Sequence, residues 1–364
     1  MKRRRYFSEP GKEYWYPLDE SLELSRMKVS KRFSKAAIQL AVLAPFDHAK
    51  KLMKDLLFLN PSVTLLEQIV DRFGTTLHRT EEKNGQRPHA ISDRETGAEV
   101  LYIQADGAMV PLWGEKCREF KENKLGMVFN DKDIVTRKMK SGDETQSIVR
   151  KKFVSSLAEG VEPFKKMLFA SAVKKGYHTA QNVVFLCDGA AWLAKCRNEY
   201  FPTAIQILDW YHAVEHLWET ARKMYGENNM DQCHQWVGPL EGLLWEGKVE
   251  TVISHLEDMA KSRKKHQTIL YELRGYYVSN REHMRYDEFR KKGWYIGSGS
   301  IESANKYIIS QRLKQSGMLW SKCGADAIIW ARCKYFEGDW DAFWDSVNIS
   351  DYLNNQPKEA AKAA

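Results

Sequence analysis

The sequence VLYIQADG, residues 100–107, determines how the middle of this chain is expected to fold. Its apolar run is rich in β-branched and aromatic residues, which favours a β-strand, and it leads directly into Asp106-Gly107. The sequence VVFLCDG, residues 183–189, repeats this arrangement, because a continuous apolar run ends in Asp188-Gly189 as in a strand buried on both faces. If the two strands are neighbours in one sheet, the two aspartates lie together.

The segments around these strands complete an α/β pattern. Strand-like runs occupy residues 124–129, 134–139 and 204–208, and helical periodicity occupies residues 148–173 and 190–200. We expect a turn after Asp106-Gly107. Together with the strand before this turn, the runs at residues 124–129 and 134–139 predict a three-stranded antiparallel meander. The run at residues 204–208 predicts a further strand, which ends at Asp209. Three antiparallel strands followed by helix, strand, helix and strand is the order of an RNase H-like mixed sheet with flanking helices.

The chain before this sheet divides into two regions. Residues 1–30 are basic, aromatic and interrupted by prolines, and we expect a basic arm with little core of its own. Residues 31–95 form an N-terminal helical region, with helical patterns at residues 34–43, 49–59 and 63–73 and a polar linker around residues 81–97. This outline fits a helix-turn-helix DNA-binding region, and it fits an ordinary small helical bundle equally well.

The second half of the chain predicts an insertion. Residues 212–289 carry no strand signal and read as an all-helical insertion, so the catalytic core would comprise residues 96–211 and 290–350. A glycine-rich turn at residues 293–300 opens a helix that places Glu302 in its first turn, so the insertion falls between the second and third acidic residues. A further helix at residues 325–336 and an aromatic segment close the core before a flexible tail, residues 351–364.

Composition favours an intracellular protein with a polyanionic partner. The 364 residues include 56 Lys and Arg against 48 Asp and Glu, a net charge of +8, which raises the expectation of nucleic-acid binding without establishing it. The six cysteines form no close pair, so we expect reduced thiols instead of disulfides or a zinc site. The basic N-terminus is not followed by an apolar run, and no apolar stretch is long enough to span a bilayer, so the sequence predicts no membrane partner.

Asp106, Asp188 and Glu302 are candidate metal ligands. Phosphodiester cleavage and joining needs charge neutralisation, which two divalent cations roughly 3.5–4 Å apart can supply when carboxylates hold them. Mg²⁺ prefers a few carboxylates with waters and phosphate oxygens, and Mn²⁺ accepts the same ligands. Taken one at a time, each residue has an ordinary interpretation, since Asp-Gly is a common turn and an acidic residue in a first helical turn suits the helix dipole. Their joint placement in this strand order favours the catalytic interpretation.

Four longer motifs give the chain a resemblance to a known family. They read FLCDGAAW at residues 185–192, DWYHAVEHLW at 209–218, GSGSIE at 297–302 and QRLKQSGMLW at 311–320. With Asp106-Gly107, they resemble the bacterial insertion-sequence transposases of the ISKra type, over roughly residues 31–344. The resemblance implies a DDE transposase, which cleaves DNA and transfers strands with Asp106, Asp188 and Glu302 as the three metal ligands.

The resemblance also implies auxiliary residues and partners. Asp209 and His212 match a carboxylate-x-x-histidine signature of such enzymes, in which His212 would bind a DNA phosphate or orient Asp209, unless the two form a structural pair. Arg312 and Lys314, on the helix that begins with Glu302, are candidates for contacting the DNA backbone, or else belong to a solvated helix face. Transposon ends and target DNA would be the partners of a homo-oligomer in the prokaryotic cytoplasm, associated with the nucleoid.

The expectations leave two alternatives open. A cysteine-rich, zinc-ribbon-like segment usually begins members of the family, and this sequence starts without one, which puts terminal-repeat recognition in doubt. The first alternative is therefore a non-catalytic DNA-binding protein derived from a transposase, although all three carboxylates are present. The second is another RNase H-fold nuclease, such as a resolvase, which would cut DNA without joining it. A strand-transfer assay separates this nuclease from a transposase.

Overall fold

The computed structural model describes residues 6–8, 13–17, 24, 27–91, 95–115, 117–138 and 144–354. The chain divides into two compact units: unit 1 comprises Met1–Arg94, Gly107–Lys175 and Ala304–Ala364, and unit 2 comprises Glu95–Asp106 and Gly176–Ser303. Most of the expected basic arm and of the expected C-terminal tail lies outside the described residues. Within the arm, β1 (Tyr6–Ser8) and β2 (Glu13–Trp15) pair as a short antiparallel sheet.

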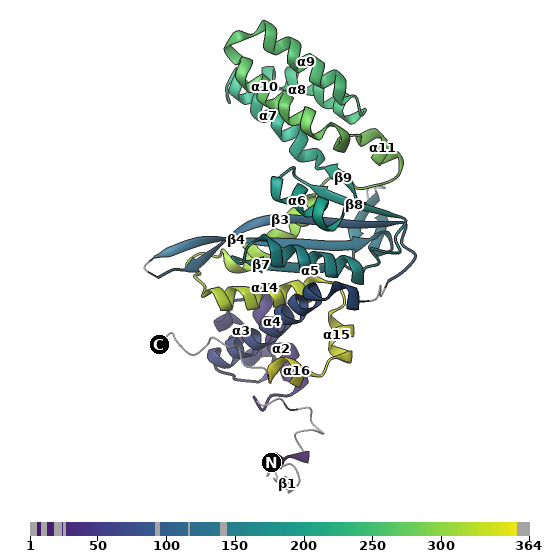
Figure 1. Cartoon of the computed structure of the whole chain (residues 1–364). Coiled ribbons are helices and arrows are strands. Elements are labelled where there is room, and N and C mark those ends of the chain that lie inside the picture. Colours follow the sequence, from purple (N-terminus) through teal and green to yellow (C-terminus); the bar gives the residue numbers. More distant parts are fainter. Residues whose placement is uncertain are drawn as a thin grey trace. The chain divides into compact units, whose positions relative to one another are not determined.

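Five strands form one mixed sheet in the order β7-β4-β3-β8-β9. They are β3 (Val100–Trp113), β4 (Arg118–Asn130), β7 (Lys152–Leu157), β8 (Asn182–Cys187) and β9 (Ile205–Leu208). In unit 1, β4 pairs antiparallel with β7. In unit 2, β8 pairs parallel with β3 on one side and with β9 on the other. The three parallel strands are almost entirely buried in their pairing segments, as expected of strands covered on both faces. The predicted mixed sheet with flanking helices is confirmed (Figure 1).

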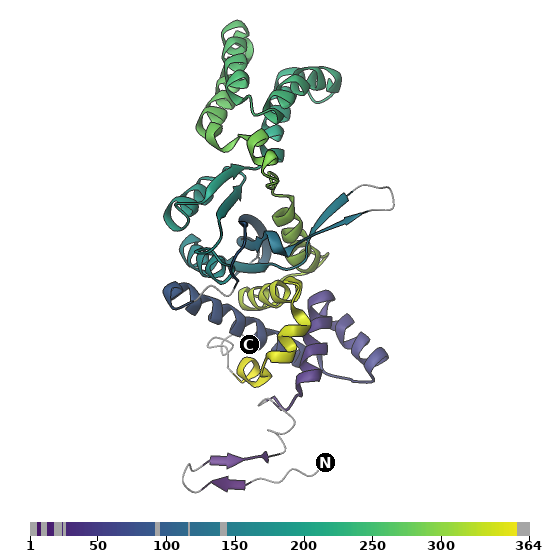
Figure 2. The ribbon, with the colours of Figure 1, turned by 90° about the vertical axis from the view of Figure 1, so that its right-hand side faces the viewer.

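The predicted meander was wrong in two places. The expected turn at Asp106-Gly107 is absent, because β3 is bonded to strands on both sides and continues to Trp113. The run at residues 134–139 is β5 (Ile134–Lys138), which pairs with β6 (Glu144–Ile148) as a separate two-stranded ribbon seen in Figure 2. Met139, the last residue of the predicted run, lies outside the described residues.

The third antiparallel strand lies inside the segment predicted as the helix 148–173. β7 has the sequence KFVSSL with five consecutive buried residues, and it precedes helix α5 (Val161–Lys174). Because residues on both faces are buried, this short segment lacks the alternation of apolar and polar residues that identifies a strand from sequence, and it was assigned to a helix.

Three N-terminal helices in unit 1 confirm the predicted helical region. They are α2 (Lys31–Leu43), α3 (Phe46–Leu57) and α4 (Val63–Gln86). The hydroxyls of Ser30 and Ser62 accept hydrogen bonds from the first turns of α2 and α4, which fixes where these helices begin. α4 continues past the predicted end at residue 73 into the first part of the expected polar linker, residues 81–86, and it packs against α5 and α14 (Lys322–Phe336). This helix is therefore part of the core of unit 1.

An aromatic cluster closes unit 1, as the sequence predicted. α14 confirms the predicted helix at residues 325–336, and it is followed by α15 (Trp340–Ser346) and α16 (Ile349–Leu353). Phe73 of α4 lies with its ring centroid 6.0 Å from that of Trp344 and 5.4 Å from that of Tyr352. Aromatic side chains bury large apolar areas, so this cluster stabilises the attachment of the C-terminal helices to α4.

Asp71 of α4 is expected to make unit 1 less stable at neutral pH. It lines a cavity of about 490 Å³, and burial, with the negative charge of Glu67, raises the pKa of its carboxyl to about 6. Because the folded protein holds this proton more tightly than the unfolded chain, stability is lost as the pH rises from about 4 through 6. Asp71→Asn should therefore raise the free energy of unfolding by about 1–3 kcal/mol at pH 7.5 and change it little at pH 4.

Urea unfolding at the two pH values measures this effect. Asp55→Asn on α3, whose side chain is exposed, is the matched control and should change stability little at either pH. An Asp71→Asn variant that gains as much stability at pH 4 as at pH 7.5 would show that ionisation of Asp71 is not the cause.

Unit 2 carries the helices that follow the parallel strands. α6 (Ala191–Tyr200) lies between β8 and β9 in sequence, and a helical block follows, comprising α7 (Trp210–Tyr225), α8 (Met230–Trp245), α9 (Val249–Ser262), α10 (Gln267–Asn280) and α11 (Tyr286–Lys291). No strand occurs in this block among the described residues, so the predicted all-helical composition is confirmed. Within this block, α7 packs against α8 and α9 packs against α10, and Figure 1 labels the four helices together.

The helix predicted after the glycine-rich turn is built from three pieces. α12 (Gly299–Ala304) is followed by a π-helical turn, Asn305–Ser310, and by α13 (Gln311–Leu313). Glu302 lies in the first turn of α12, as predicted. A π-helical turn shifts the direction of the side chains that follow it, so a regular helical period does not hold from Glu302 to Arg312.

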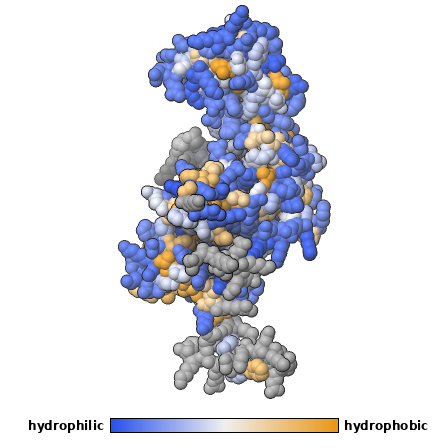
Figure 3. Space-filling model, turned by 60° about the vertical axis from the view of Figure 1, so that its left-hand side comes forward, coloured by the Kyte–Doolittle hydropathy of each residue, from blue (hydrophilic) through white to orange (hydrophobic). Residues whose placement is uncertain are grey.

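The described surface on the face shown in Figure 3 is mostly hydrophilic. On the face shown in Figure 3, apolar residues occur in small patches among hydrophilic ones. The most exposed of the large apolar side chains are Phe58 (90% exposed), Trp113 and Leu56. Within the described residues, no helix combines the length and the apolar character needed to cross a membrane.

Candidate active site

The two aspartates predicted from sequence occupy matching positions on neighbouring parallel strands. Val100 pairs with Asn182 and Gln104 with Leu186, so the same register continued by two residues places Asp106 opposite Asp188. Parallel neighbouring strands lie about 4.8 Å apart, which brings the two Cα positions close together. The prediction that these aspartates lie on adjacent strands is confirmed.

Asp209 extends this row across a third strand. Val184 pairs with Ile205 and Cys187 with Leu208, so Asp209 falls opposite Asp188, and its backbone N–H donates to the Cys187 carbonyl over 2.8 Å. Asp106, Asp188 and Asp209 therefore form a row just past the carboxyl ends of β8 and β9 and beside the middle of β3, which continues to Trp113. In open α/β sheets, ligands bind beyond the carboxyl ends of the strands, and the ends of β8 and β9 place Asp188 and Asp209 there.

The surroundings of Asp188 leave its carboxylate half-buried. Its Oδ1 accepts a hydrogen bond of 2.8 Å from the backbone N–H of Ala190, and its Oδ2 lies 3.9 Å from Nε2 of His212. This turn favours glycine at position 189 for two reasons. The φ angle there is +89°, and a Cβ would lie 3.1 Å from the Leu208 side chain. One carboxylate oxygen is thus held by the backbone while the other faces the histidine.

Asp209 is fully buried and connects two segments of unit 2. Its Oδ1 accepts from the backbone N–H of His212 over 2.6 Å, which caps helix α7, and its Oδ2 accepts from the backbone N–H of Ser298. The backbone N–H of Trp210 also donates to the Ile296 carbonyl over 2.9 Å. The glycine-rich loop before α12 is therefore fixed against the start of α7.

The same loop positions Glu302. The Ser298 hydroxyl donates to Oε1 of Glu302 over 2.9 Å, and the Glu302 side chain is otherwise exposed. The Ser300 hydroxyl donates to Oε1 of Gln104 over 2.6 Å, and Gln104 lies two residues before Asp106 on the same face of β3. Asp209, Ser298 and Ser300 thus connect Glu302 to the strands that carry Asp106 and Asp188.

The three predicted carboxylates do not form a compact ligand group. Among the described residues, the group of three ligand atoms lying within 4.8 Å of one another is His78, Glu82 and Glu159, which belongs to unit 1. Asp106, Asp188 and Glu302 all belong to unit 2, where hydrogen bonds of Ser298 and Ser300 join the segment of Glu302 to Asp209 and to β3. They remain predicted catalytic and metal-binding residues.

Ser298, Gln104 and Tyr276 contribute to this site and were not identified from sequence. Burial raises the pKa of the Tyr276 hydroxyl, and the acidic groups around it, Asp188 and Asp209 among them, raise it further. This hydroxyl keeps its proton and has no hydrogen-bond partner among the described residues, so it is available as a donor. Ser298 lay within the quoted GSGSIE motif, whereas Tyr276 lies on a helix with no motif around it.

The two basic residues predicted to contact DNA belong to unit 1 and differ from each other. Arg312 is 1% exposed, its Nε donates to the Ala41 carbonyl over 3.0 Å, and its guanidinium lies over the rings of Phe46 and Trp320. Burial lowers the pKa of Arg312 to about 10. The predicted surface contact of Arg312 with a DNA phosphate is therefore not supported, because the π-helical turn directs it inward. Lys314 is exposed and remains a candidate.

The comparisons with known proteins place the chain in one family. A search of curated proteins found no match. The model of the Uncharacterised protein family (UPF0236) matches residues 1–347. Because this match spans the sheet, the helical block and the site, the chain belongs to the uncharacterised protein family UPF0236.

Proposed function

We propose that this protein is a metal-dependent DNA transposase of the DDE class, related to the ISKra-type insertion-sequence transposases, with an RNase H-like core. The observation that carries the proposal is the shared register of Asp106 and Asp188 on adjacent parallel strands, with Glu302 connected to the same strands through Ser298 and Ser300. The resemblance of the quoted motifs supports the same assignment. Asp106, Asp188 and Glu302 are its proposed catalytic residues.

The donor set fits a hard divalent cation. Asp106 and Asp188 are half-buried and Glu302 is exposed, so none of the three residues is fully shielded from solvent. Mg²⁺ takes oxygen ligands and keeps several waters, and Mn²⁺ takes the same set. Asp106, Asp188 and Glu302 would hold two such ions. When bound, the ions would activate the nucleophile and neutralise charge on the scissile phosphate.

The residues around the carboxylates have separable roles in this proposal. Asp209 fixes the loop that carries Glu302, and it is therefore a positioning residue. His212, with Nε2 facing Asp188, can hydrogen-bond a phosphate oxygen of bound DNA. Tyr276 offers a protonated hydroxyl beside the same strands. The enzyme would bind transposon ends and target DNA, and it would act as a homo-oligomer on DNA.

A strand-transfer assay tests the proposed function. The full-length protein is incubated with Mg²⁺, a labelled duplex carrying an element end and a supercoiled target plasmid. A transposase releases a 3′ hydroxyl at the end and joins it to the plasmid, giving a covalent product. Cleavage without joining would favour the resolvase alternative, and binding without cleavage would favour the non-catalytic alternative.

Lys314 and Arg312 give a matched pair for the DNA-binding part of the proposal. Lys314→Ala should weaken binding to every duplex and reduce the slope of log affinity against log salt by about 0.9, because one phosphate contact releases about that many counterions. Arg312→Ala should leave the slope unchanged and lower the free energy of unfolding by about 2–4 kcal/mol, through lost packing on Phe46 and Trp320. Fluorescence anisotropy at several salt concentrations measures both slopes. Equal slopes for Lys314→Ala and the wild type would remove Lys314 from the interface.

A further inference from the structure

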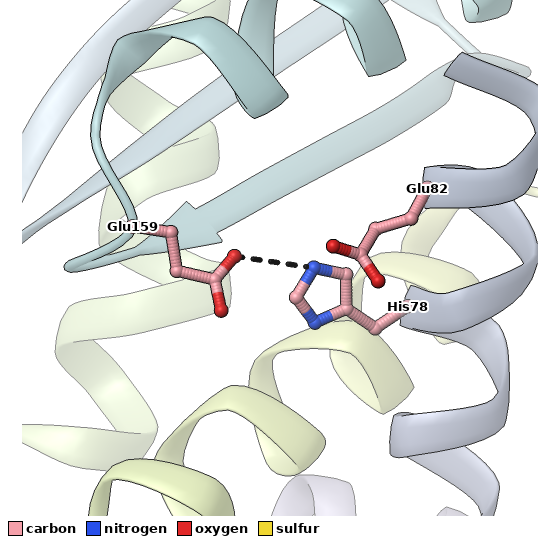
Figure 4. A group of neighbouring side chains, drawn as sticks. All are labelled: His78, Glu82 and Glu159. Carbon is pink, nitrogen blue, oxygen red and sulfur yellow. Dashed lines mark ion pairs between the residues drawn. The ribbon is translucent and has the colours of Figure 1, made fainter. Parts of the chain in front are cut away.

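A second group of potential metal ligands lies in unit 1, outside the site described above. His78 and Glu82 are four residues apart on α4, so they share one face of the helix, and Glu159 follows β7. Figure 4 shows the three side chains pointing toward one another. One ligand atom from each residue lies within 4.8 Å of the others.

His78 is oriented as metal-binding histidines are. Its Nδ1 lies 2.7 Å from Oδ2 of Asp326 on α14, and its ring stacks on Trp330 with centroids 5.1 Å apart and an interplanar angle of 19°. A carboxylate on one ring nitrogen fixes the tautomer and leaves the other nitrogen free to bind a metal. These two contacts set the direction of Nε2.

The Nε2 atom of His78 has no hydrogen-bond partner although it is buried. The His78 side chain is 9% exposed, and Nε2 faces Oε2 of Glu159 at 3.5 Å, as the dashed line in Figure 4 marks. A buried polar atom without a partner is costly, because it has lost its water without replacing it. The nitrogen is therefore directed at a position where a further atom would satisfy it.

We propose that His78, Glu82 and Glu159 form a site for a divalent transition metal, with Asp326 supporting His78 from behind. One imidazole and two carboxylates suit Zn²⁺, which takes His nitrogen at about 2.0–2.1 Å and carboxylate oxygen at about 2.0–2.2 Å. A nitrogen ligand favours such metals over Mg²⁺, which prefers oxygen ligands alone. Glu159 is partly exposed, so the site is open to solvent on one side. The metal would connect α4, the end of β7 and, through Asp326, α14.

A proton would compete with the metal ion for Nε2 of His78. Burial lowers the pKa of His78, but the hydrogen bond and charge of Asp326, with the charges of Glu159 and Glu82, outweigh it and raise the pKa. The metal must displace this proton, so its affinity should fall as the pH decreases. An imidazolium held between two carboxylates would satisfy Nε2 without any metal, and this is the alternative that the experiment has to exclude.

Zinc binding by the untagged full-length protein tests the proposal. Isothermal titration calorimetry with Zn²⁺ is done in a background where the two exposed cysteines, Cys117 and Cys323, are serines, so that surface thiols do not bind the metal. We expect His78→Gln and Glu159→Gln to lose one Zn²⁺ per chain. Asp326→Asn should weaken the affinity about 10–100-fold, because it acts on the orientation of His78. His48→Gln on α3, an exposed histidine, is the matched control and should change nothing.

The outcome does not depend on the proposed transposase activity. An Asp188→Ala variant should keep the zinc site of unit 1, and excess Mg²⁺ should not compete for it. Zinc should also raise the Tm of the wild type and of His48→Gln, but not that of His78→Gln. An unchanged zinc stoichiometry in His78→Gln, or no zinc binding by the parent protein, would overturn the proposal. Circular dichroism spectra establish that each variant is folded.

Discussion

Asp188→Ala is expected to lower the rate of Mg²⁺-dependent cleavage of an end-containing duplex by a factor on the order of 10³ or more. Asp188 lies in the middle of the acidic row, opposite Asp106 on one side and Asp209 on the other. Charge neutralisation by a held cation contributes several kcal/mol to phosphoryl transfer, and each 1.36 kcal/mol changes the rate about tenfold. Asp106→Ala and Glu302→Ala should have effects of similar size. DNA binding by all three variants should persist.

The control for this prediction separates catalysis from helix electrostatics. Asp231 is an exposed acidic residue in the first turn of α8, as Glu302 is in the first turn of α12. Asp231→Ala should remove a favourable interaction with the helix dipole, worth about 0.3–1 kcal/mol, and leave cleavage unchanged. If Glu302→Ala cleaves at the wild-type rate as well, Glu302 has only the ordinary role of an acidic residue in a first helical turn.

Asp209→Ala is expected to lower the free energy of unfolding by about 2–5 kcal/mol and to lower cleavage at the same time. The buried carboxylate accepts the backbone N–H groups of His212 and Ser298, and removal of the acceptor leaves both donors unsatisfied. Each unsatisfied buried group costs about 1–3 kcal/mol. Urea unfolding measures the stability, and the cleavage assay measures the effect on the position of Glu302.

Two variants distinguish a positioning role for Asp209 from a catalytic one. Asp209→Asn keeps one carbonyl oxygen as an acceptor, so it should recover part of the stability and part of the cleavage. His212→Ala keeps the Asp209 contacts with the backbone, so it should leave stability within about 1 kcal/mol of the wild type. An Asp209→Ala variant as stable as the wild type would contradict the role of this carboxylate in fixing the loop before α12.

The parallel strands and most helices were predictable because their signals are local. β8 is a continuous apolar run with an aspartate at its end, and α2 and α4 carry apolar residues at helical spacing. The adjacency of Asp106 and Asp188 was expected only on the assumption of an RNase H-like sheet, in which their two strands are neighbours. β7 was missed for a physical reason, since it is a short run buried on both faces, and burial of that kind removes the alternation on which the strand prediction depends.

The inward position of Arg312 and the His78 group were not predictable in the same way. The π-helical turn at Asn305–Ser310 changes the face on which Arg312 emerges, and nothing in the local sequence signals such a turn. The four-residue spacing of His78 and Glu82 is present in the sequence, but the predicted helix ended at residue 73 and Glu82 was assigned to the polar linker. Glu159 and Asp326, however, reach His78 only through tertiary packing, so the group became recognisable only from the structure.

The position of bound Mn²⁺ tests the three-carboxylate site most directly. Crystals of the full-length protein with an end-containing duplex, grown with Mn²⁺, would be measured for the anomalous scattering of manganese. The proposal predicts a peak contacted by the carboxylates of both Asp106 and Asp188, with Glu302 contacting that ion or a second one roughly 3.5–4 Å away. Manganese bound only at other positions, with the Asp106 and Asp188 carboxylates contacting none, would contradict the proposed active site.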